Sequence, residues 1–298
     1  MLSKLRHFAY DRREQRLDTH LDESQLSLLL QEHNIFASSI RRINGGTLGL
    51  SYSLQIDGRP KVLKTHFSAV GRQNIEKEIR LLRVLYVGES EMSRLELTSD
   101  QLVRVALLMD EFKYPQHELE PSQIISLTAQ YTAQFKCNAT PDVIATKDTM
   151  STLFAEGVAS LARLYANQAI SPAIHAAVEK NFSILSEHID GLPVALCHGD
   201  LGPENIMCQT DSKPVVIDWE DAFWGVEGYD YLYWLTFLRN RKYYAQDVLG
   251  KTSLGKEIEL AILVLIVVLK SELSLRMDPQ MNRQLSFDQR ITEILELK

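Results

Sequence analysis

Four polar residues in two neighbouring stretches of the sequence have the types and spacing needed to handle a proton and a metal ion. The first stretch, LCHGDLGPENIM (residues 196–207), contains His198, Asp200 and Asn205, and the second, VVIDWED (215–221), contains Asp218. A carboxylate can accept the proton of a hydroxyl group, and amide and carboxylate oxygens are ligands that Mg²⁺ prefers. The alternative is a surface turn beside a strand that ends in an acid. Motifs elsewhere in the chain are needed to distinguish the two interpretations.

Three further stretches contain the other parts that phosphoryl transfer from a nucleotide needs. The segment KVLKTHF places Lys64 in an expected strand, and KEIRLL places Glu78 in the helix that follows. A lysine can neutralise phosphate oxygens, and a helix carboxylate can hold that lysine in place. Backbone N–H groups of a glycine-rich turn can approach phosphates because no Cβ intervenes. The candidate turn contains Gly45, Gly46, Thr47 and Gly49.

Each of these features has a simpler explanation when taken alone. The two adjacent glycines could form a plain hairpin turn, and Lys64 could be a solvated strand residue. Glu76 lies two positions from Glu78 and faces another side of the helix, so at most one of them can point at Lys64. We favour Glu78, and the sequence leaves the choice open. It is the order of the parts along the chain that favours a shared site.

The catalytic stretch also resembles a known family. The spacing of His198, Asp200 and Asn205 matches H-x-D-x-x-x-x-N of a kinase catalytic loop, and Asp218 falls where the metal-binding aspartate of D-F-G would lie. Together with the tract Gly228-Tyr229-Asp230, these residues resemble the aminoglycoside phosphotransferase and choline kinase family, which is the small-molecule branch of the protein-kinase-like fold. The resemblance spans roughly residues 40 to 240.

The resemblance implies a role for each catalytic-loop residue. Asp200 would be the catalytic base, or would orient the acceptor hydroxyl, and His198 would support the loop. Asn205 and Asp218 would bind Mg²⁺.

The resemblance also implies a nucleotide site. Lys64 would contact the α- and β-phosphates with Glu78 as its partner, and residues 108–112 would form the hinge near the base, including Asp110 and Phe112. The nucleotide loop would be shaped by Gly45, Gly46, Thr47 and Gly49.

An acidic and aromatic stretch after Asp218 is a candidate acceptor site. Glu220, Asp221 and Trp224 could bind a cationic amine through charge and cation–π contacts. The alternative is that these residues belong to the core of the molecule, which is the interpretation we favour for Trp234.

The elements that must position these residues change in character along the chain. Residues 40–67 are typical of a β-meander with a hairpin at Asp57-Gly58, and a helix with apolar residues at helical spacing follows around residues 75–85. Residues 103–112 form another expected strand, and most of the chain beyond residue 120 is expected to be helical. We therefore predict an α+β fold of two lobes, an N-terminal lobe (1–112) and a helical C-terminal lobe (113–298), with the site between them.

Composition limits the other classes of function. The chain of 298 residues is 45% hydrophobic and 24% charged, as expected for a globular protein, and its net charge of −7 argues against nucleic acid or an anionic membrane as a partner. Three cysteines without a CxxC pair indicate a reducing compartment, where we expect them to be small buried residues. The apolar run 260–269 is too short to span a membrane and predicts a buried helix. We expect a cytoplasmic monomer or homodimer.

The predicted activity is Mg²⁺-dependent transfer of the γ-phosphate of ATP or GTP to a hydroxyl of a small molecule. The acceptor would be an aminoglycoside-like antibiotic, an amino sugar, a choline-like amine or a related metabolite. One alternative is a degenerate nucleotide-binding protein, that is, a regulatory pseudokinase. A protein kinase is less favoured, because Gly199 replaces the arginine that senses a phosphorylated activation loop and no A-P-E tract follows Asp218.

Overall fold

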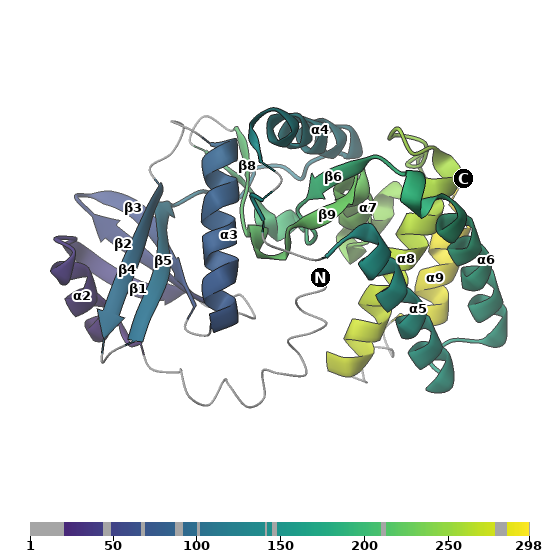
Figure 1. Cartoon of the computed structure of the whole chain (residues 1–298), viewed down its shortest axis with the longest axis horizontal. Coiled ribbons are helices and arrows are strands. Elements are labelled where there is room, and N and C mark those ends of the chain that lie inside the picture. Colours follow the sequence, from purple (N-terminus) through teal and green to yellow (C-terminus); the bar gives the residue numbers. More distant parts are fainter. Residues whose placement is uncertain are drawn as a thin grey trace.

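The structure is a computed structural model that describes residues 21–43, 49–66, 69–86, 92–99, 102–140, 142–144, 148–209, 213–277 and 285–297. Two lobes lie side by side along its longest axis, one built around a β-sheet and the other mainly of helices (Figure 1). This arrangement confirms the predicted α+β fold of two lobes.

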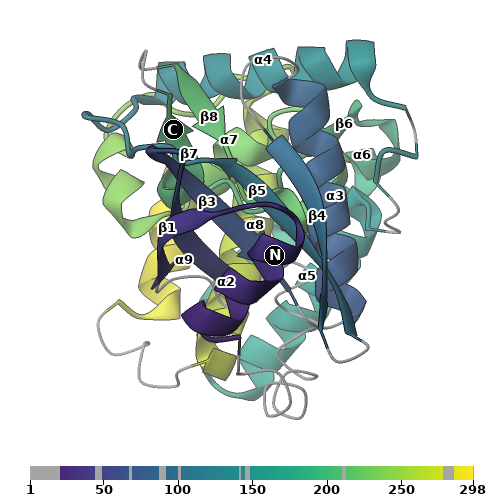
Figure 2. The same ribbon diagram turned by 90° about the vertical axis from the view of Figure 1, so that its left-hand side faces the viewer.

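The first lobe is an antiparallel sheet with a helix on each face. Its strands lie in the order β1-β2-β3-β5-β4. Their bounds are β1 (Ala37–Ile43), β2 (Leu50–Ile56), β3 (Arg59–Thr65), β4 (Met92–Ser99) and β5 (Leu102–Asp110). Helix α2 (Glu23–Glu32) covers one face and helix α3 (Ala69–Leu85) covers the other (Figures 1 and 2).

Side-chain alternation along β3 determines where Lys64 points. Leu63 is buried with Leu26 in the small core between the sheet and α2. The next residue, Lys64, points to the opposite face, where α3 lies, because successive side chains of a strand alternate. The turn before β3 has positive φ at Asp57 (52°) and Gly58 (73°), as a type I′ hairpin requires. The predicted hairpin is therefore confirmed.

Sequence reasoning missed strand β4. Its apolar residues Leu95 and Leu97 are interspersed with the charged Arg94 and Glu96. Among the described strands it lies at the edge of the sheet, next to β5, and an edge strand commonly carries charged side chains.

The second lobe is organised around one long helix. Helix α8 (Lys256–Met277) contacts four other helices, and all of its residues from 261 to 269 are buried, which confirms the predicted buried helix. In the described parts of the chain, no helix is both long and apolar enough to cross a membrane. The remaining helices are α4 (Pro121–Asn138), α5 (Met150–Ala166), α6 (Pro172–His188), α7 (Tyr229–Leu235) and α9 (Phe287–Leu295).

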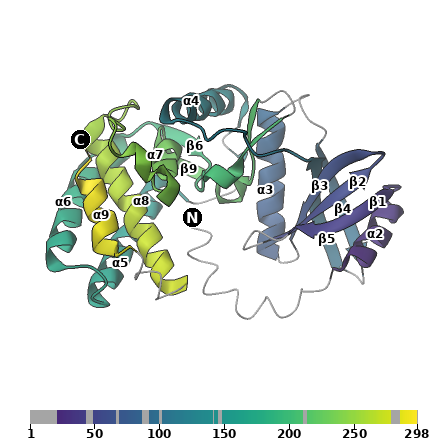
Figure 3. The ribbon, with the colours of Figure 1, turned by 180° about the vertical axis from the view of Figure 1, so that it is seen from behind.

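Two short antiparallel strand pairs lie between the sheet and most of the helices (Figures 1 and 3). Strand β6 (Val194–Cys197) pairs with β9 (Phe223–Val226), and β7 (Ile206–Cys208) pairs with β8 (Pro214–Val216). The segments that follow β6 and β8 contain the polar residues singled out in the sequence. The fold therefore brings the two polar stretches to the middle of the molecule.

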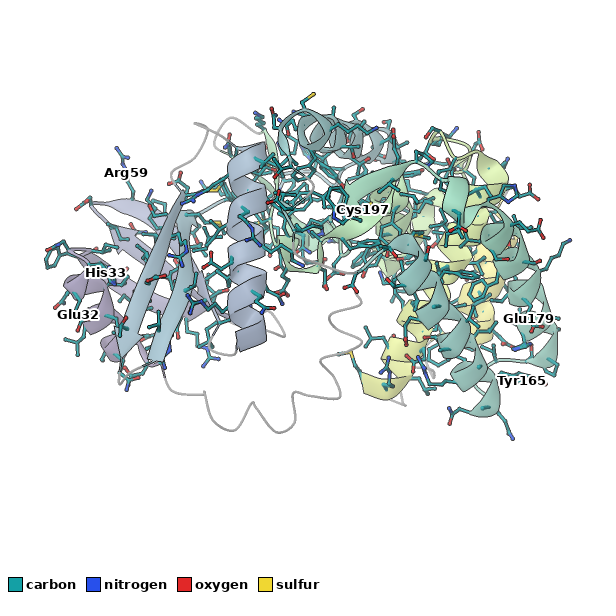
Figure 4. All side chains as sticks on the ribbon, in the orientation of Figure 1. Glu32, His33, Arg59, Tyr165, Glu179 and Cys197 are labelled. Atoms are coloured by element: carbon teal, nitrogen blue, oxygen red, sulfur yellow. The ribbon has the colours of Figure 1, made fainter. Side chains whose placement is uncertain are left out.

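The cysteines differ in exposure. Cys197 lies at the centre of the molecule among packed side chains, whereas Tyr165 and Glu179 lie at its periphery (Figure 4). Cys208 is half-buried and Cys137 is exposed. The prediction that the thiols are buried is therefore wrong for Cys137, which lies near the end of a helix whose other face contacts the core.

Helix α7 begins at a glycine that no other residue could replace without strain. Gly228 has φ of 92°, and a Cβ there would lie 2.6 Å from Cγ2 of Thr252. Gly255 has a similar φ of 78°, but a Cβ there would meet no atom within 4 Å. The two positions thus share the backbone strain and differ in the space available.

We expect Gly228→Ala to lower the free energy of unfolding by about 2–4 kcal/mol and Gly255→Ala by about 1 kcal/mol. Both alanines would adopt a left-handed backbone, but only the first would also overlap a neighbouring side chain. Urea denaturation of both variants measures the difference. Equal losses would contradict the steric explanation.

Candidate active site

A lysine and two carboxylates meet where the two lobes adjoin. The Lys64 Nζ donates a hydrogen bond to Oε2 of Glu78 at 2.7 Å and a second one to Oδ1 of Asp218. The backbone N–H of Asp218 donates to the other oxygen of Glu78, Oε1, at 2.9 Å. Lys64 comes from β3 and Glu78 from α3, whereas Asp218 follows β8, so this contact joins the two lobes.

The structure places Glu76 away from this contact. Glu76 accepts hydrogen bonds from Arg94 on strand β4, with a shortest distance of 2.7 Å to Nη2. Residues two positions apart on a helix face different sides, and here Glu78 faces Lys64 while Glu76 faces the sheet edge. Of the two glutamates that the sequence left open, Glu78 therefore contacts the lysine.

The two acids keep Lys64 charged. Burial alone would lower the pKa of the Lys64 ammonium, but the Asp218 and Glu78 carboxylates outweigh burial and raise its pKa well above the ordinary value. Lys64 therefore carries a positive charge throughout the neutral range, as contact with phosphate oxygens requires.

His198 fixes the turn that carries Asp200. Its Nε2 donates to the carbonyl oxygen of Ile217 at 2.8 Å, and its Nδ1 accepts from the backbone N–H of Asp200 at 3.2 Å. The ring also packs against Trp219, with 4.7 Å between centroids. Gly199, which lies between His198 and Asp200, has φ of 82°, and a Cβ there would lie 2.3 Å from the backbone oxygen of Asp221. The histidine and the glycine of the stretch His-Gly-Asp thus each have a structural reason for their residue type.

A hairpin brings the backbone of Asn205 next to the residue that precedes Asp218. Strands β7 and β8 pair, and beyond them the N–H of Ile217 donates to the carbonyl oxygen of Asn205 at 3.0 Å. The side-chain Nδ2 of Asn205 donates to the backbone oxygen of Asp200 at 2.9 Å. This bond uses the amide nitrogen, so the amide oxygen is the atom that remains for a cation.

The donor set fits Mg²⁺ rather than a fully protein-bound metal. Within the described ranges there is no group of three or more His, Cys, Asp or Glu side chains that could hold a metal ion. Mg²⁺ usually takes only one or two carboxylates from the protein and completes its octahedron with phosphate oxygens and water. Asn205 and Asp218 are compatible with that pattern.

Asp230 anchors the turn from behind. Its carboxylate accepts hydrogen bonds from the backbone N–H groups of His198 (2.8 Å) and Gly199 (3.0 Å) and from the hydroxyl of Tyr131 (2.5 Å). Burial raises the pKa of Asp230 above its usual value, although the hydrogen bonds and His198 oppose the shift. Sequence reasoning noted the tract that contains Asp230 but assigned it no contact.

Two more residues near the site carried no sequence signal. The hydroxyl of Tyr233 on α7 donates to Oδ1 of Asp200 at 2.5 Å. Lys77 on α3 donates to the carbonyl oxygen of Ala222 at 3.2 Å, and burial lowers the pKa of its ammonium. Both contacts depend on how helices pack, so no local pattern could have identified them.

The candidate acceptor residues lie next to Asp218 but are largely enclosed. Glu220 and Asp221 are buried, and Oε2 of Glu220 lies 3.4 Å from Nε2 of His66. Trp224 lies half-buried on β9, opposite Leu196 of β6. Trp234 is buried in the core, as we favoured from the sequence.

The expected nucleotide-loop and hinge residues are described only in part. Gly45, Gly46 and Thr47 lie outside the described residues, whereas Gly49 adjoins β2 and packs so close to His66 that a Cβ would lie 2.7 Å from its ring. At the other end of the sheet, Asp110 is the last residue of β5 and pairs with Lys61 at 2.8 Å, and Phe112 is buried.

Comparison with known protein families shows that most of the chain matches one family model. The family model of the phosphotransferase enzyme family (APH) matches residues 39–247, a range that includes every residue of the candidate site. No curated protein sequence matches the chain.

Solved structures show the same fold at low sequence identity. A thermostable variant of aminoglycoside phosphotransferase APH(4)-Ia, in a ternary complex with ADP and hygromycin B, has a TM-score of 0.60 and 14% identity, covering 90% of this chain and 96% of that one. A GDP complex of an aminoglycoside 2'-phosphotransferase-IIIa variant has a TM-score of 0.60 and 18% identity, covering 92% and 94%. Spectinomycin phosphotransferase APH(9)-Ia, with ADP and spectinomycin, has a TM-score of 0.58 and 15% identity, covering 92% and 93%.

We expect Asp230→Ala to lower the free energy of unfolding by about 3–5 kcal/mol, because three donors would lose their partner inside the protein. Glu227→Ala is the control: it removes an exposed ion pair with Lys136 and should cost at most about 1 kcal/mol. Chemical denaturation measures both values. A loss below 1 kcal/mol for Asp230→Ala would show that the turn does not depend on this anchor.

Proposed function

Because the chain belongs to the phosphotransferase enzyme family, we propose that it is a Mg²⁺-dependent small-molecule kinase that transfers the γ-phosphate of ATP or GTP to a hydroxyl group. The observation that carries this proposal is the contact of the Lys64 ammonium with Glu78 and Asp218. Lys64 lies where the two lobes meet, next to Asp218, whose carboxylate is the proposed ligand of Mg²⁺. The Lys64 and Asp218 side chains remain 13% and 32% exposed, so a ligand can reach both.

In the proposed reaction, Asp200 accepts the proton of the acceptor hydroxyl while the acceptor oxygen forms a bond to the γ-phosphorus. The bond from that phosphorus to the β–γ bridging oxygen breaks, and its electron pair remains with the nucleoside diphosphate. Lys64 neutralises phosphate oxygens that are not transferred. When bound by Asn205 and Asp218, Mg²⁺ would stabilise the negative charge on the phosphoryl oxygens.

Structural neighbours supply the candidate substrates. They were solved with ADP, with AMP-PNP and with GDP, which supports a nucleoside triphosphate as donor and leaves ATP and GTP as the two candidates. Two of them contain hygromycin B or spectinomycin. We propose a hydroxylated acceptor of the same broad kind: an aminoglycoside-like antibiotic, an amino sugar, a choline-like amine or a related metabolite. Of the acceptor residues proposed from the sequence, the half-buried Trp224 is the one that an acceptor can contact directly, whereas the buried Glu220 and Asp221 would act on a cationic acceptor through their charge.

We expect ATP or GTP to raise the melting temperature of the wild-type protein only when Mg²⁺ is present. A ligand at about 100 times its dissociation constant stabilises the native state by about 2.7 kcal/mol, which corresponds to several degrees at about 2–4 °C per kcal/mol. In Asp218→Ala the Mg²⁺-dependent part of the shift should be lost. Thermal unfolding of both proteins with each nucleotide, with and without Mg²⁺, measures this.

The same measurement addresses the donor. The nucleotide with the larger shift is the one to use in an acceptor screen. If neither nucleotide shifts the wild-type melting temperature, the nucleotide site proposed around Lys64 and Asp218 is wrong.

We expect Asp200→Asn to bind Mg²⁺ and nucleotide as wild type does but to lose about 10²–10⁴-fold in turnover, the usual contribution of a positioned general base. Acceptor-dependent release of nucleoside diphosphate measures turnover, with hygromycin B and spectinomycin among the acceptors. Asp190→Asn, at an exposed acid of the short segment Ile189–Gly191, is the matched control. Nucleotide binding without turnover in the wild type would favour a regulatory pseudokinase.

A further inference from the structure

We propose that Tyr233 is a positioning residue that holds the Asp200 carboxylate in the orientation needed to accept a proton from the acceptor. This inference rests on the proposed function, in which Asp200 is the base. Neither the sequence nor the family match assigns a role to Tyr233.

The contact is direct and involves a single carboxylate oxygen. The Tyr233 hydroxyl donates to Oδ1 of Asp200 at 2.5 Å. The backbone of Asp200 is fixed separately, because its N–H donates to His198 and its carbonyl oxygen accepts from the Asn205 side chain. These contacts fix the backbone of Asp200, and the Tyr233 hydroxyl contacts its side chain, where it restrains the orientation of the carboxylate.

The tyrosine is itself held firmly enough to act as a support. Its side chain is buried, with the ring stacked on Tyr229 at 6.0 Å between centroids and meeting Phe237 edge-on at 5.8 Å. The Lys270 ammonium lies 4.1 Å from the centroid of the same ring and donates to the Thr236 hydroxyl at 2.8 Å. A ring packed on several sides presents its hydroxyl in one place.

The hydroxyl also remains a donor. Burial, together with the Asp200 carboxylate, raises the pKa of Tyr233 well above its usual value, so the phenol keeps its proton at neutral pH. An acceptor-only group at this position could not make the same contact, because an ionised carboxylate offers no proton.

A positioning role has a specific kinetic consequence. A base accelerates proton transfer only when it lies within hydrogen-bond reach of the proton, and loss of alignment costs rate rather than binding. Removing the hydroxyl should therefore lower kcat and leave the KM for nucleotide unchanged, since the nucleotide contacts come from Lys64 and Asp218.

The rival explanation is that Tyr233 is only a core aromatic residue. Tyr233→Phe distinguishes the two, because phenylalanine keeps the ring and removes the hydroxyl alone. Tyr231→Phe is a matched control on the same helix: Tyr231 is also buried, and its hydroxyl donates to the carbonyl oxygen of Val248 at 2.8 Å rather than to the loop.

The experiment compares full-length wild type, Tyr233→Phe, Tyr231→Phe and Asp200→Asn, with Mg²⁺ and ATP or GTP, and with water, hygromycin B and spectinomycin as acceptors. We expect Tyr233→Phe to lower kcat about tenfold, with the KM for nucleotide and the nucleotide-induced thermal shift within about twofold of wild type. Tyr231→Phe should keep kcat within about twofold.

Any one of the following outcomes would overturn the inference. Wild-type kcat in Tyr233→Phe, with Asp200→Asn inactive, would overturn this inference alone. An equal fall in both tyrosine variants, or a fall in Tyr233→Phe that follows a loss of nucleotide binding, would show a purely structural role. Turnover in the wild type that is unchanged in Asp200→Asn would overturn the proposed function and this inference with it.

Discussion

One lysine ammonium is shared by carboxylates from both lobes and so joins the two halves of the molecule. Lys64 projects from the sheet, Glu78 from α3, and Asp218 from the segment after β8. An isolated buried ammonium would be unstable, so Lys64 can occupy this place only while acids face it. The packing of α3 against the sheet keeps Glu78 in position, and the backbone contact of Asp218 with Glu78 fixes the other lobe to the same point.

A second set of contacts holds the loop that carries Asp200. The carboxylate of Asp230 binds the backbone of the loop, and the hydroxyl of Tyr233, one turn further along α7, binds the side chain of Asp200. Both come from one helix, and that helix packs on the buried helix α8. The long apolar helix α8 thus supports the helix that fixes the Asp200 loop, and its Lys270 also contacts the ring of Tyr233.

The part of this site that sequence could predict is the part that depends on order along the chain. The stretch from His198 to Asn205 and the strand containing Lys64 follow from spacing and from alternation. The sequence favoured Glu78 over Glu76 but could not exclude Glu76, because the choice depends on how α3 is rotated against the sheet. In the structure Glu76 contacts Arg94, which lies on a strand that the sequence did not predict. The contact of Tyr233 with Asp200 could not be predicted for a similar reason. Helix α7 contains several aromatic residues, and only the packing of the helix shows which of them faces Asp200.

The contact between Arg94 and Glu76 connects the edge strand of the sheet to the helix that carries Glu78. Glu76 and Glu78 lie two residues apart on the same helix, one tied to the edge strand and the other to the lysine and to Asp218. Both contacts run through one helix, so the edge strand β4 and the contact between the two lobes share a single rigid element. The rim of the sheet is therefore part of the framework that sets the position of Glu78, although it lies away from Lys64 and Asp218.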